Sequence, residues 1–376
     1  MKGDELMGLF KKMEAADYEQ VVFLQDKSTG LKGVTVIHDT TLGPALGGTR
    51  YWTYDKEEDA LEDALRLAKG MTYKNAAAGL PLGGGKTVIL KDPDKLVNKE
   101  ALFRVFGRFV EGLNGRYVTA PDVGTNPDLM DYIYQETDYV VSTNLKPGTS
   151  GNPSPATAYG VYVGTKAAAK RAYGSDSLQG KTVLLEGVGS VGLNLAERFL
   201  NEGAKVVASD INEARLAEAK ELGCQTVPSA QLLEQKGDIY SPCALGATLN
   251  ADSIEKLVAS GVKVVSGSAN NQLDEDKDGD KLEEKGIVYT PDYILNAGGA
   301  IQVSDEFNGG YDRDRNFKQV ENIYNQIESV FDLADRDKIP TYQAADRFAE
   351  ERIQAIAKTK SIFKQKDKSA LSPKIN

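Results

Sequence analysis

Apolar and polar positions in the first third of the chain alternate as they do in strands and amphipathic helices. Residues 18–24 and 31–37 are rich in β-branched and aromatic side chains and are joined by a turn-forming segment, which predicts a β-hairpin. Residues 57–69 carry apolar side chains at the spacing of an amphipathic helix. A strand at 87–90 and a helix at about 99–113 are predicted to follow. Together these elements indicate a mixed α/β unit.

The pattern changes after a loop rich in glycine, serine and proline at 148–155. A predicted helix at 158–173 leads into short, buried-type strands, which are separated by a helix at 193–202 and further connections. These strands lie at 181–186, 205–210, 237–240, 262–266 and 286–289. The succession predicts a doubly wound parallel sheet. The chain is predicted to be helical from about 316 to 358, and the polar tail at 364–376 is expected to be mobile.

Composition restricts the class of protein. The 376 residues exceed what one core ordinarily organises, so two domains are expected. Apolar residues make up 41% and charged residues 27%, as in soluble globular proteins. A net charge of −10 and a pI near 5.0 argue against nucleic acid and anionic membranes as partners. No apolar run approaches the roughly 18–20 residues of a membrane span, and the N-terminus lacks a signal-peptide core.

The scarcity of histidine and cysteine limits the chemistry. The single histidine, His38, excludes a histidine-rich metal site and argues against a Ser–His–Asp mechanism. Its place at the end of a predicted strand favours a packing role. Cys224 and Cys243 form no zinc pattern and no disulfide framework, so we expect no metal and a reducing, cytoplasmic location. Acid–base chemistry is therefore expected from lysine, carboxylate or tyrosine.

Two lysines stand in a stretch rich in alanine and glycine that carries few other charges. Lys86 follows three consecutive glycines, and a chain gives up three successive side chains where its backbone bends or comes close to something. A lysine fixed there can be desolvated and then loses its proton more readily. Lys74 lies in the same stretch, where an unpaired ammonium is costly. We therefore expect an anionic ligand near Lys74.

The glycines before Lys86 superficially match a phosphate-binding loop. That motif requires a glycine five residues before Gly85, where this chain has Leu80, and Pro81 lacks an amide that would face phosphate. β-branched residues also follow Lys86 where a helix should begin. The segment is therefore not predicted to bind a nucleoside triphosphate.

A glycine-rich turn in the second half matches a dinucleotide-binding fingerprint. It follows a predicted strand, opens a predicted helix and consists of Gly187, Val188, Gly189, Ser190, Val191 and Gly192. The first glycine permits a tight turn, the second lets the backbone approach a pyrophosphate, and the third lets helix and strand pack closely. The helix N-terminus would then face the phosphates.

Asp210 ends the next predicted strand and completes the fingerprint. Its carboxylate can accept hydrogen bonds from two ribose hydroxyls and would repel a 2′-phosphate, which favours NAD over NADP. Asn212 and Arg215 stand nearby and keep NADP open.

These features occur within an ordered set of segments that resembles the Glu/Leu/Phe/Val dehydrogenase superfamily, and most closely its leucine-type members. The segments are residues 40–50, 71–90, 122–126, 151–158, 242–247, 267–272 and 296–300, and they extend through most of the chain. The resemblance implies reversible NAD-dependent oxidative deamination of an L-amino acid to a 2-oxo acid, ammonia and NADH.

The resemblance also implies an organisation. An N-terminal α/β substrate-binding and oligomerisation domain would comprise residues 1–148 plus about 335–376, and a Rossmann-type NAD-binding domain would comprise 149–334. A cleft would separate the two domains and close on the substrate. A homo-oligomer is expected, octameric by similarity to leucine-type relatives.

By the same resemblance, Lys74 pairs with the substrate carboxylate, Lys86 is the general base on the attacking water, and Asp122 exchanges protons with the amino group. Gly47 offers a backbone contact to the carboxylate. Asn271, or alternatively Asn270, bridges substrate and nicotinamide. The remaining expected cofactor contacts are Thr157, Cys243 and Ala244.

The family's side-chain pocket corresponds here to Leu46, Ala120, Ala300 and Val303. All four are apolar, so a glutamate substrate is not expected. Leucine, valine and isoleucine are expected substrates, with a phenylalanine- or valine-preferring enzyme as the alternative, because one methyl group discriminates by only about 1–3 kcal/mol. A non-catalytic NAD-binding regulator and an ammonia-independent oxidoreductase are further alternatives.

Overall fold

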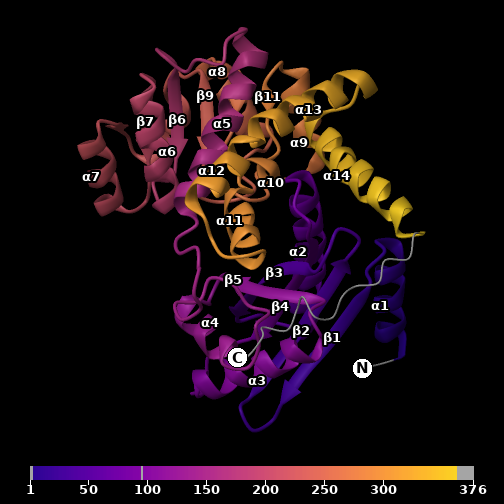
Figure 1. Cartoon of the computed structure of the whole chain (residues 1–376). Helices are drawn as coiled ribbons and strands as arrows, with labels where there is room; N and C mark the ends of the chain where they lie inside the picture. Colours follow the sequence, from indigo (N-terminus) through magenta and orange to yellow (C-terminus); the bar gives the residue numbers. More distant parts are fainter. Residues whose placement is uncertain (1–2, 95, 362–376) are drawn as a thin grey trace.

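The polypeptide folds around two separate β-sheets, which form the lower and the upper body in Figure 1. The computed structural model describes residues 3–94 and 96–361. The N-terminal elements build the lower body, the middle of the chain builds the upper body, and the last long helix runs back toward the lower body (Figure 1).

The lower body contains a mixed five-stranded sheet in the order β1-β2-β4-β3-β5. Its strands are β1 (Gln20–Asp26), β2 (Leu31–Asp39), β3 (Ala45–Trp52), β4 (Gly83–Leu90) and β5 (Tyr117–Pro121). Strand β2 is antiparallel to β1 and β4, whereas β3 is parallel to both β4 and β5. Its helices are α1 (Gly3–Ala15), α2 (Glu57–Ala77), α3 (Lys99–Gly112) and α4 (Pro127–Tyr134).

Two hydrophobic clusters hold these helices to the sheet. Helix α2 buries a stripe of small and apolar residues, and α3 buries two phenylalanines in a separate cluster. The first cluster includes Ala60, Ala64, Leu65, Ala68, Val34, Val36 and Val88, and the second includes Phe103, Phe106, Leu24, Tyr117 and Met130.

The predicted hairpin and the helix at 99–113 are confirmed, but the prediction for this body was incomplete. Helix α2 continues eight residues beyond the predicted end at residue 69, past Gly70, because its buried face goes on packing against the sheet. Strands β3 and β5 and helix α4 were not predicted. Glycines at 47 and 48 lower the strand propensity of β3, which conceals it in the sequence.

The triple glycine before Lys86 lies inside strand β4 and marks a close approach instead of a bend. A Cβ on Gly84 would lie 2.1 Å from the backbone nitrogen of Thr72 on α2, and a Cβ on Gly83 would lie 1.9 Å from the carbonyl oxygen of Asp39. In the adjacent strand, a Cβ on Gly47 would lie 1.7 Å from the carbonyl oxygen of Gly85. Only glycine allows this spacing.

The upper body contains a wholly parallel six-stranded sheet in the order β11-β10-β9-β6-β7-β8, which confirms the predicted doubly wound sheet. Its strands are β6 (Thr182–Glu186), β7 (Lys205–Ser209), β8 (Gln225–Thr226), β9 (Ile239–Pro242), β10 (Val264–Val265) and β11 (Val288–Tyr289). Every predicted strand of this sheet is present, and β8 is additional.

Helices cover both faces of this sheet and continue to the end of the described chain (Figure 1). They are α5 (Ser154–Tyr173), α6 (Ser190–Asn201), α7 (Glu213–Leu222), η1 (Ser229–Glu234), α8 (Ala251–Ser260), α9 (Asp276–Glu284), α10 (Asp292–Leu295), α11 (Gly298–Phe307), α12 (Arg313–Glu321), α13 (Ile323–Asp337), α14 (Thr341–Ala357) and η2 (Lys358–Ser361). The predicted helical region at 316–358 thus consists of α12, α13 and α14. The predicted mobile tail at 364–376 lies outside the described residues.

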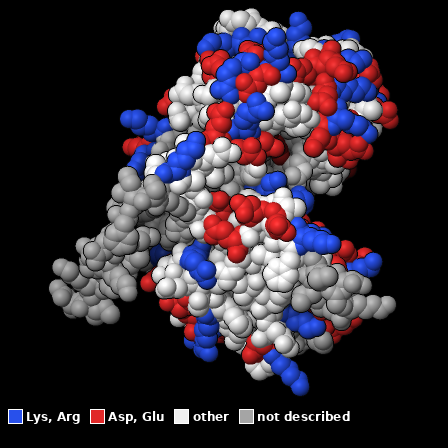
Figure 2. Space-filling model, turned by 90° about the vertical axis from the view of Figure 1, so that its right-hand side faces the viewer, with Lys and Arg blue, Asp and Glu red and all other residues white. Residues whose placement is uncertain are grey.

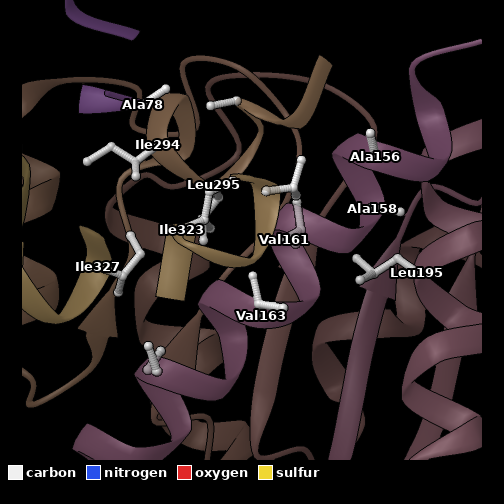
Figure 3. Close-up of a cluster of buried hydrophobic side chains, with 14 of the residues drawn as sticks. Ala78, Ala156, Ala158, Val161, Val163, Leu195, Ile294, Leu295, Ile323 and Ile327 are labelled. Carbon is white, nitrogen blue, oxygen red and sulfur yellow. The ribbon is translucent and has the colours of Figure 1, made fainter. Parts of the chain in front are cut away.

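One hydrophobic cluster joins the two bodies. Ala78, at the end of α2, belongs to the same cluster as Ile294 of α10, Ile323 and Ile327 of α13, and Val161 of α5 (Figure 3). Helix α14 adds a polar link, because Arg352 donates hydrogen bonds to the carbonyl oxygens of Ala76 and Leu80, each at 2.9 Å. These contacts attach the end of α2 to the upper body.

Three other sequence-based expectations can be compared with the structure. His38 is buried at the end of β2, where its ring nitrogens lie 2.8 Å from Thr72 Oγ1 and 3.0 Å from the carbonyl oxygen of Ala16, so its packing role is confirmed. None of the helices in the described ranges has both the length and the apolarity to cross a bilayer. The domain boundaries near residues 148 and 335 stay a prediction.

The close approach of α2 to β4 makes Gly84→Ala strongly destabilising, because its Cβ would meet backbone atoms that cannot move independently. We expect a loss of about 1–3 kcal/mol and a corresponding fall in the apparent melting temperature. Gly70→Ala is the matched control: a Cβ at this helical position meets no atom within 4 Å, so a gain of about 0.5–1 kcal/mol is expected. Equal melting temperatures for both variants by calorimetry would contradict the packing argument.

Candidate active site

A cavity of about 430 Å³ opens between the two bodies, and Figure 2 shows the surface hollowed there. Its walls include Arg50, Lys74, Lys86 and Asp122 from the lower body and Asn270, Asn271 and Asp292 from the upper body. A larger cavity, of about 890 Å³, lies between residues 78–81 and helices α11 to α13. The predicted site residues Lys74, Lys86, Asp122, Asn270 and Asn271 line the smaller cavity, and none of the predicted site residues lines the larger one.

Lys86 and Asp122 form the centre of the cavity. Lys86 Nζ lies 2.8 Å from Asp122 Oδ2, and the lysine side chain is only 6% exposed. Strand β4 supplies the lysine, and the turn after β5 supplies the aspartate. Thr125 holds that turn, because its Oγ1 accepts a hydrogen bond from the backbone N–H of Asp122 at 2.8 Å. The structure therefore joins the two predicted catalytic residues in one buried ion pair.

Arg50 of β3 extends the pair into a network. Its Nε lies 2.9 Å from Asp122 Oδ2, and its Nη1 lies 2.6 Å from Asp63 Oδ2 on α2. Two cations thus contact the same oxygen of Asp122. Neither Arg50 nor Asp63 was predicted from the sequence as a site residue, although Arg50 ends the first family-like segment.

Burial and charge shift the pKa values of this network. Burial lowers the pKa of Lys86, and the Asp122 carboxylate opposes that effect. Burial alone would raise the pKa of Asp122, but the charges of Lys86 and Arg50 outweigh it and lower that pKa. The pair is consequently a lysine that releases its proton more readily than usual beside a carboxylate that stays ionised.

Lys74 lies in the last turn of α2, where the negative end of the helix dipole favours a cation. Burial lowers the pKa of Lys74 to about 8, Asp292 across the cavity opposes this shift, and the like charge of Lys86 adds to it. No ion pair with Lys74 is formed among the described residues. An ammonium in this position can still take an anionic partner, and the expected anionic ligand stays a prediction.

Asp292 and Asn296, one turn apart, hold the two asparagines of the upper wall. Asp292 accepts a hydrogen bond from the backbone N–H of Asn271, and Asn270 Oδ1 accepts one from Asn296 Nδ2 at 2.7 Å. Asn271 has a left-handed backbone, with φ of 52°, and the Asp292 contact stabilises it. Asp292 was not predicted from the sequence as a site residue, although it follows β11 at the carboxyl end of a parallel sheet, where ligands ordinarily bind.

The glycine turn after β6 has the geometry that a pyrophosphate requires. Gly187 has φ of 90°, and a Cβ there would lie 2.8 Å from Ala244. A Cβ on Gly192 would lie 2.1 Å from the carbonyl oxygen of Gly187. Gly189 is the N-cap of α6 and has no side chain that could cap the helix. The space where its Cβ would be is open. Backbone amides at this helix start are thus accessible to a phosphate group.

Asp210 lies beside this turn and accepts backbone hydrogen bonds on both oxygens. Val188 N–H donates to Oδ2 and Asn212 N–H donates to Oδ1, each at 2.8 Å. Each oxygen retains a lone pair for a ribose hydroxyl. Within the fingerprint, Val188 is buried, Ser190 is exposed and Val191 is half-buried.

The loop after β9 completes this crevice. The strand order places β6 between β7 and β9, which is the point where the direction of the connections reverses and nucleotides bind in such sheets. Ala244 contacts the position of a Gly187 Cβ, and Cys243 Sγ accepts a weak hydrogen bond from Ser268 N–H at 3.5 Å. Thr157, on α5, lies beside Gly299 at the start of α11.

The four predicted side-chain pocket residues fall in the cluster that joins the bodies. Leu46 is buried in it, and Ala120, Ala300 and Val303 pack against it. They come from β3, β5 and α11, so the structure brings together residues of both bodies. These residues, Gly47 and the fingerprint do not line the charged cavity itself.

Comparison with known proteins finds matches that cover most of the chain. The family description "Glu/Leu/Phe/Val dehydrogenase, dimerisation domain" matches residues 18–139, and "Glutamate/Leucine/Phenylalanine/Valine dehydrogenase" matches residues 148–222 and 210–360. The leucine dehydrogenase of Geobacillus stearothermophilus is 59% identical over 367 residues, which cover 97% of this chain and 99% of the relative. That of Bacillus subtilis (strain 168) is 57% identical, covering 97% and 100%. The crystal structure of L-tryptophan dehydrogenase from Nostoc punctiforme matches with a TM-score of 0.82 and 41% identity, over 93% of this chain and 99% of that one.

The Asp292 carboxylate opposes the fall in the pKa of Lys74, so Asp292→Asn should lower that pKa below its value of about 8. Removing a negative charge destabilises the ammonium, and the neutral amine then prevails at lower pH. Competitive acetylation with acetic anhydride at a series of pH values, followed by mass spectrometry, measures the titration of Lys74 directly. Asp346→Asn is the control, because Asp346 lines the same cavity but is bonded to Tyr293 OH at 2.9 Å. An unchanged Lys74 titration in Asp292→Asn would refute the proposed electrostatic contact.

Proposed function

Because the chain belongs to the Glu/Leu/Phe/Val dehydrogenase family, we propose that it catalyses the reversible NAD-dependent oxidative deamination of branched-chain L-amino acids. L-leucine is the proposed main substrate, with valine and isoleucine also used. The products are the 2-oxo acid, ammonia and NADH.

The observation that carries this proposal is the Lys86–Asp122 pair, in contact at 2.8 Å in a cavity that also contains Lys74. Amino acid oxidation requires an anchor for a carboxylate, a base for water and a group that exchanges protons with an amine. This cavity offers one candidate for each role, and it opens toward the body that carries the dinucleotide turn.

In the proposed mechanism, NAD supplies the hydride acceptor when it is bound. Loss of hydride from Cα leaves an iminium carbon, and the oxygen of a water molecule forms a bond to that carbon while neutral Lys86 accepts a water proton. Asp122 accepts a proton from the substrate ammonium group before the hydride is lost, and it returns this proton to the nitrogen after water has added. The C–N bond then breaks as the hydroxyl proton passes to Asp122 and the C=O bond forms, and ammonia leaves. The lowered pKa of Lys86 supports its role as base, and the lowered pKa of Asp122 keeps this carboxylate ionised and able to accept the proton of the substrate ammonium group.

Lys74 is the proposed partner of the substrate carboxylate, with the backbone at Gly47 nearby. A carboxylate in this place would stabilise the ammonium of Lys74, whose pKa burial lowers to about 8. Substrate binding would thus satisfy a charge that has no ion-pair partner among the described residues.

Asn271 is the proposed bridge between substrate and nicotinamide, in preference to Asn270. The side-chain oxygen of Asn270 already accepts the hydrogen bond from Asn296. Within the described ranges no hydrogen bond engages the side chain of Asn271, which is exposed at the cavity wall. Thr157, Cys243 and Ala244 are the further proposed cofactor contacts.

NAD is the proposed cofactor, in preference to NADP. A 2′-phosphate would meet the Asp210 carboxylate, and Arg215, the nearby cation, is paired with Glu218 at 2.9 Å. The two relatives named leucine dehydrogenase, at 59% and 57% identity, favour leucine over the aromatic substrate named for the relative at 41%. The phenylalanine- or valine-preferring enzyme is the alternative, and a non-catalytic NAD-binding regulator is disfavoured by the intact Lys86–Asp122 pair.

We extend the proposal to organisation. Residues 1–148 with about 335–376 would form the substrate-binding and oligomerisation domain, and residues 149–334 the NAD-binding domain. The family description for residues 18–139 names dimerisation, which supports a homo-oligomer, and an octamer in the cytoplasm is the specific proposal. Nucleic acid, membrane and metal are not proposed as partners.

The substrate assignment predicts that NAD reduction is faster with L-leucine than with L-phenylalanine in initial-rate assays at alkaline pH. Leu46, Ala120, Ala300 and Val303 supply only apolar contacts, so valine and isoleucine should be used within about 10–200-fold of leucine. Ammonia-dependent NADH consumption with 4-methyl-2-oxopentanoate tests the reverse reaction. A higher rate with phenylalanine would reject leucine, and NADH consumption without ammonia would reject deamination.

The role of Lys86 predicts that Lys86→Met lowers kcat by about 10²–10⁴-fold, the usual contribution of a general base. Asp122 would remain paired with Arg50 in this variant, so the fold should persist. The dissociation constant for NADH, measured by fluorescence, should stay at its wild-type value. Lys91→Met, an exposed lysine just beyond the same strand, is the control. Loss of NADH binding in Lys86→Met would instead assign this lysine to the cofactor site.

A further inference from the structure

Arg50 is a buried cation without a role in the mechanism proposed above. It lies on β3, its side chain is 20% exposed, and its guanidinium bridges Asp122 of the lower wall and Asp63 of α2 at 2.9 and 2.6 Å. The planar guanidinium can hold two carboxylates at once, which an ammonium cannot do with the same geometry.

A second layer of contacts fixes Arg50 in place. Asp63 Oδ2 also accepts a hydrogen bond from Tyr54 OH at 2.6 Å, and Asp63 Oδ1 accepts one from Arg66 Nη2 at 2.8 Å. Asp63 is therefore itself held on both oxygens. Arg50 cannot follow Asp122 or leave it without breaking the contact with α2.

The decisive detail is that Arg50 Nε and Lys86 Nζ approach the same oxygen, Asp122 Oδ2. A general base must be neutral when it accepts a proton, and a neutral Lys86 gives Asp122 no compensating charge. A buried carboxylate without a cation would then take up a proton itself. Arg50 remains charged throughout, so Asp122 keeps one cation in both protonation states of Lys86.

We propose that Arg50 is a positioning residue that holds Asp122 in the ionised form that accepts the substrate proton, and that keeps a cation on Asp122 Oδ2 while Lys86 cycles between its charged and neutral forms. The inference rests on the proposed roles of Lys86 and Asp122. Arg50 affects the reaction only through these two side chains, since it is not assigned a contact with substrate or cofactor.

The surrounding charges agree with this assignment. The charge of Arg50 lowers the pKa of Asp122, and it also contributes to lowering the pKa of Lys86, after burial. The other titratable groups that act on the pair are Asp63 and Lys74 from α2 and Tyr117 from β5, and Asp292 from α10 acts on Lys74. Of these groups, only Lys74 carries a positive charge, and it makes no ion pair with Asp122.

Neutral substitutions of Arg50 test the proposal through the pH profile of kcat at saturating L-leucine and NAD, which reports groups of the enzyme complex. Without the charge of Arg50, Lys86 loses a repelling cation and retains the whole attraction of Asp122. The acid limb of the profile is the rise of kcat with pH as Lys86 loses its proton. In Arg50→Met this limb should therefore move to higher pH by about one unit. Arg50→Gln has no charge but keeps N–H donors for both carboxylates, and it should show the same shift.

Two variants separate charge from structure. Arg50→Lys keeps the charge but cannot bridge both carboxylates, so kcat should fall at every pH while the limb stays in place. Arg66→Met removes an exposed arginine that contacts the same Asp63 but not Asp122, so its limb should also stay in place. NADH binding should be unchanged in all four variants.

A uniform loss of kcat in Arg50→Met and Arg50→Gln, with the limb at its wild-type pH, would overturn the proposal and leave a structural role. An equal shift in Arg66→Met, or failure of both neutral variants to fold, would do the same. If wild-type protein shows no turnover with any branched-chain L-amino acid, it is the proposed function that fails, and this result is distinct from an unshifted limb in active variants.

Discussion

The structure of the site depends on one oxygen atom, Asp122 Oδ2, which is contacted by two cations in a largely buried place. Removing a charge from water is costly unless partners are close and well oriented. The three side chains come from β3, β4 and the turn after β5, which are neighbours in one sheet. Their geometry is therefore set by strand spacing and register, and a shift of one residue would turn Lys86 to the other face of the sheet.

Two structural features set the register of these strands. Glycines at 47 and 83–85 allow β3, β4 and α2 to approach more closely than side chains would permit. On the neighbouring positions, buried hydroxyls pair across the strands: Thr35 with Thr87 at 2.8 Å, and Thr49 with Thr119 at 2.6 Å. A polar group buried in this way is stable only when it finds its partner, so a slipped register would leave several hydroxyls unsatisfied. The same close packing that makes the sheet intolerant of side chains thus holds the ion pair.

The sequence predicted the upper body better than the lower one, for a physical reason. Parallel strands buried on both faces appear as short apolar runs between helices, and a glycine turn with a following aspartate marks the nucleotide crevice from local spacing alone. Strand β3 is hidden by its two glycines, which are needed only because β4 lies alongside. Lys86 was singled out by its glycine-rich surroundings, its role and Asp122 were named through family resemblance, and Arg50 and Asp292 were missed. Their partners, Asp63 and Lys74, stand far away in the chain, and no local pattern records such pairs.

The division of the site between two bodies bears on selectivity. Leu46 and Ala120 belong to the lower sheet, whereas Ala300 and Val303 belong to α11 in the upper body. Ala78, Ile294 and Ile323 belong to the same hydrophobic cluster, and Arg352 of α14 binds the carbonyl oxygens at the end of α2. Because one methyl group changes binding by only about 1–3 kcal/mol, a small change in this packing alters the space for a side chain as much as a substitution in the pocket does. If the four residues line the side-chain pocket as proposed, selectivity among apolar amino acids would depend on how the bodies pack as well as on these residues.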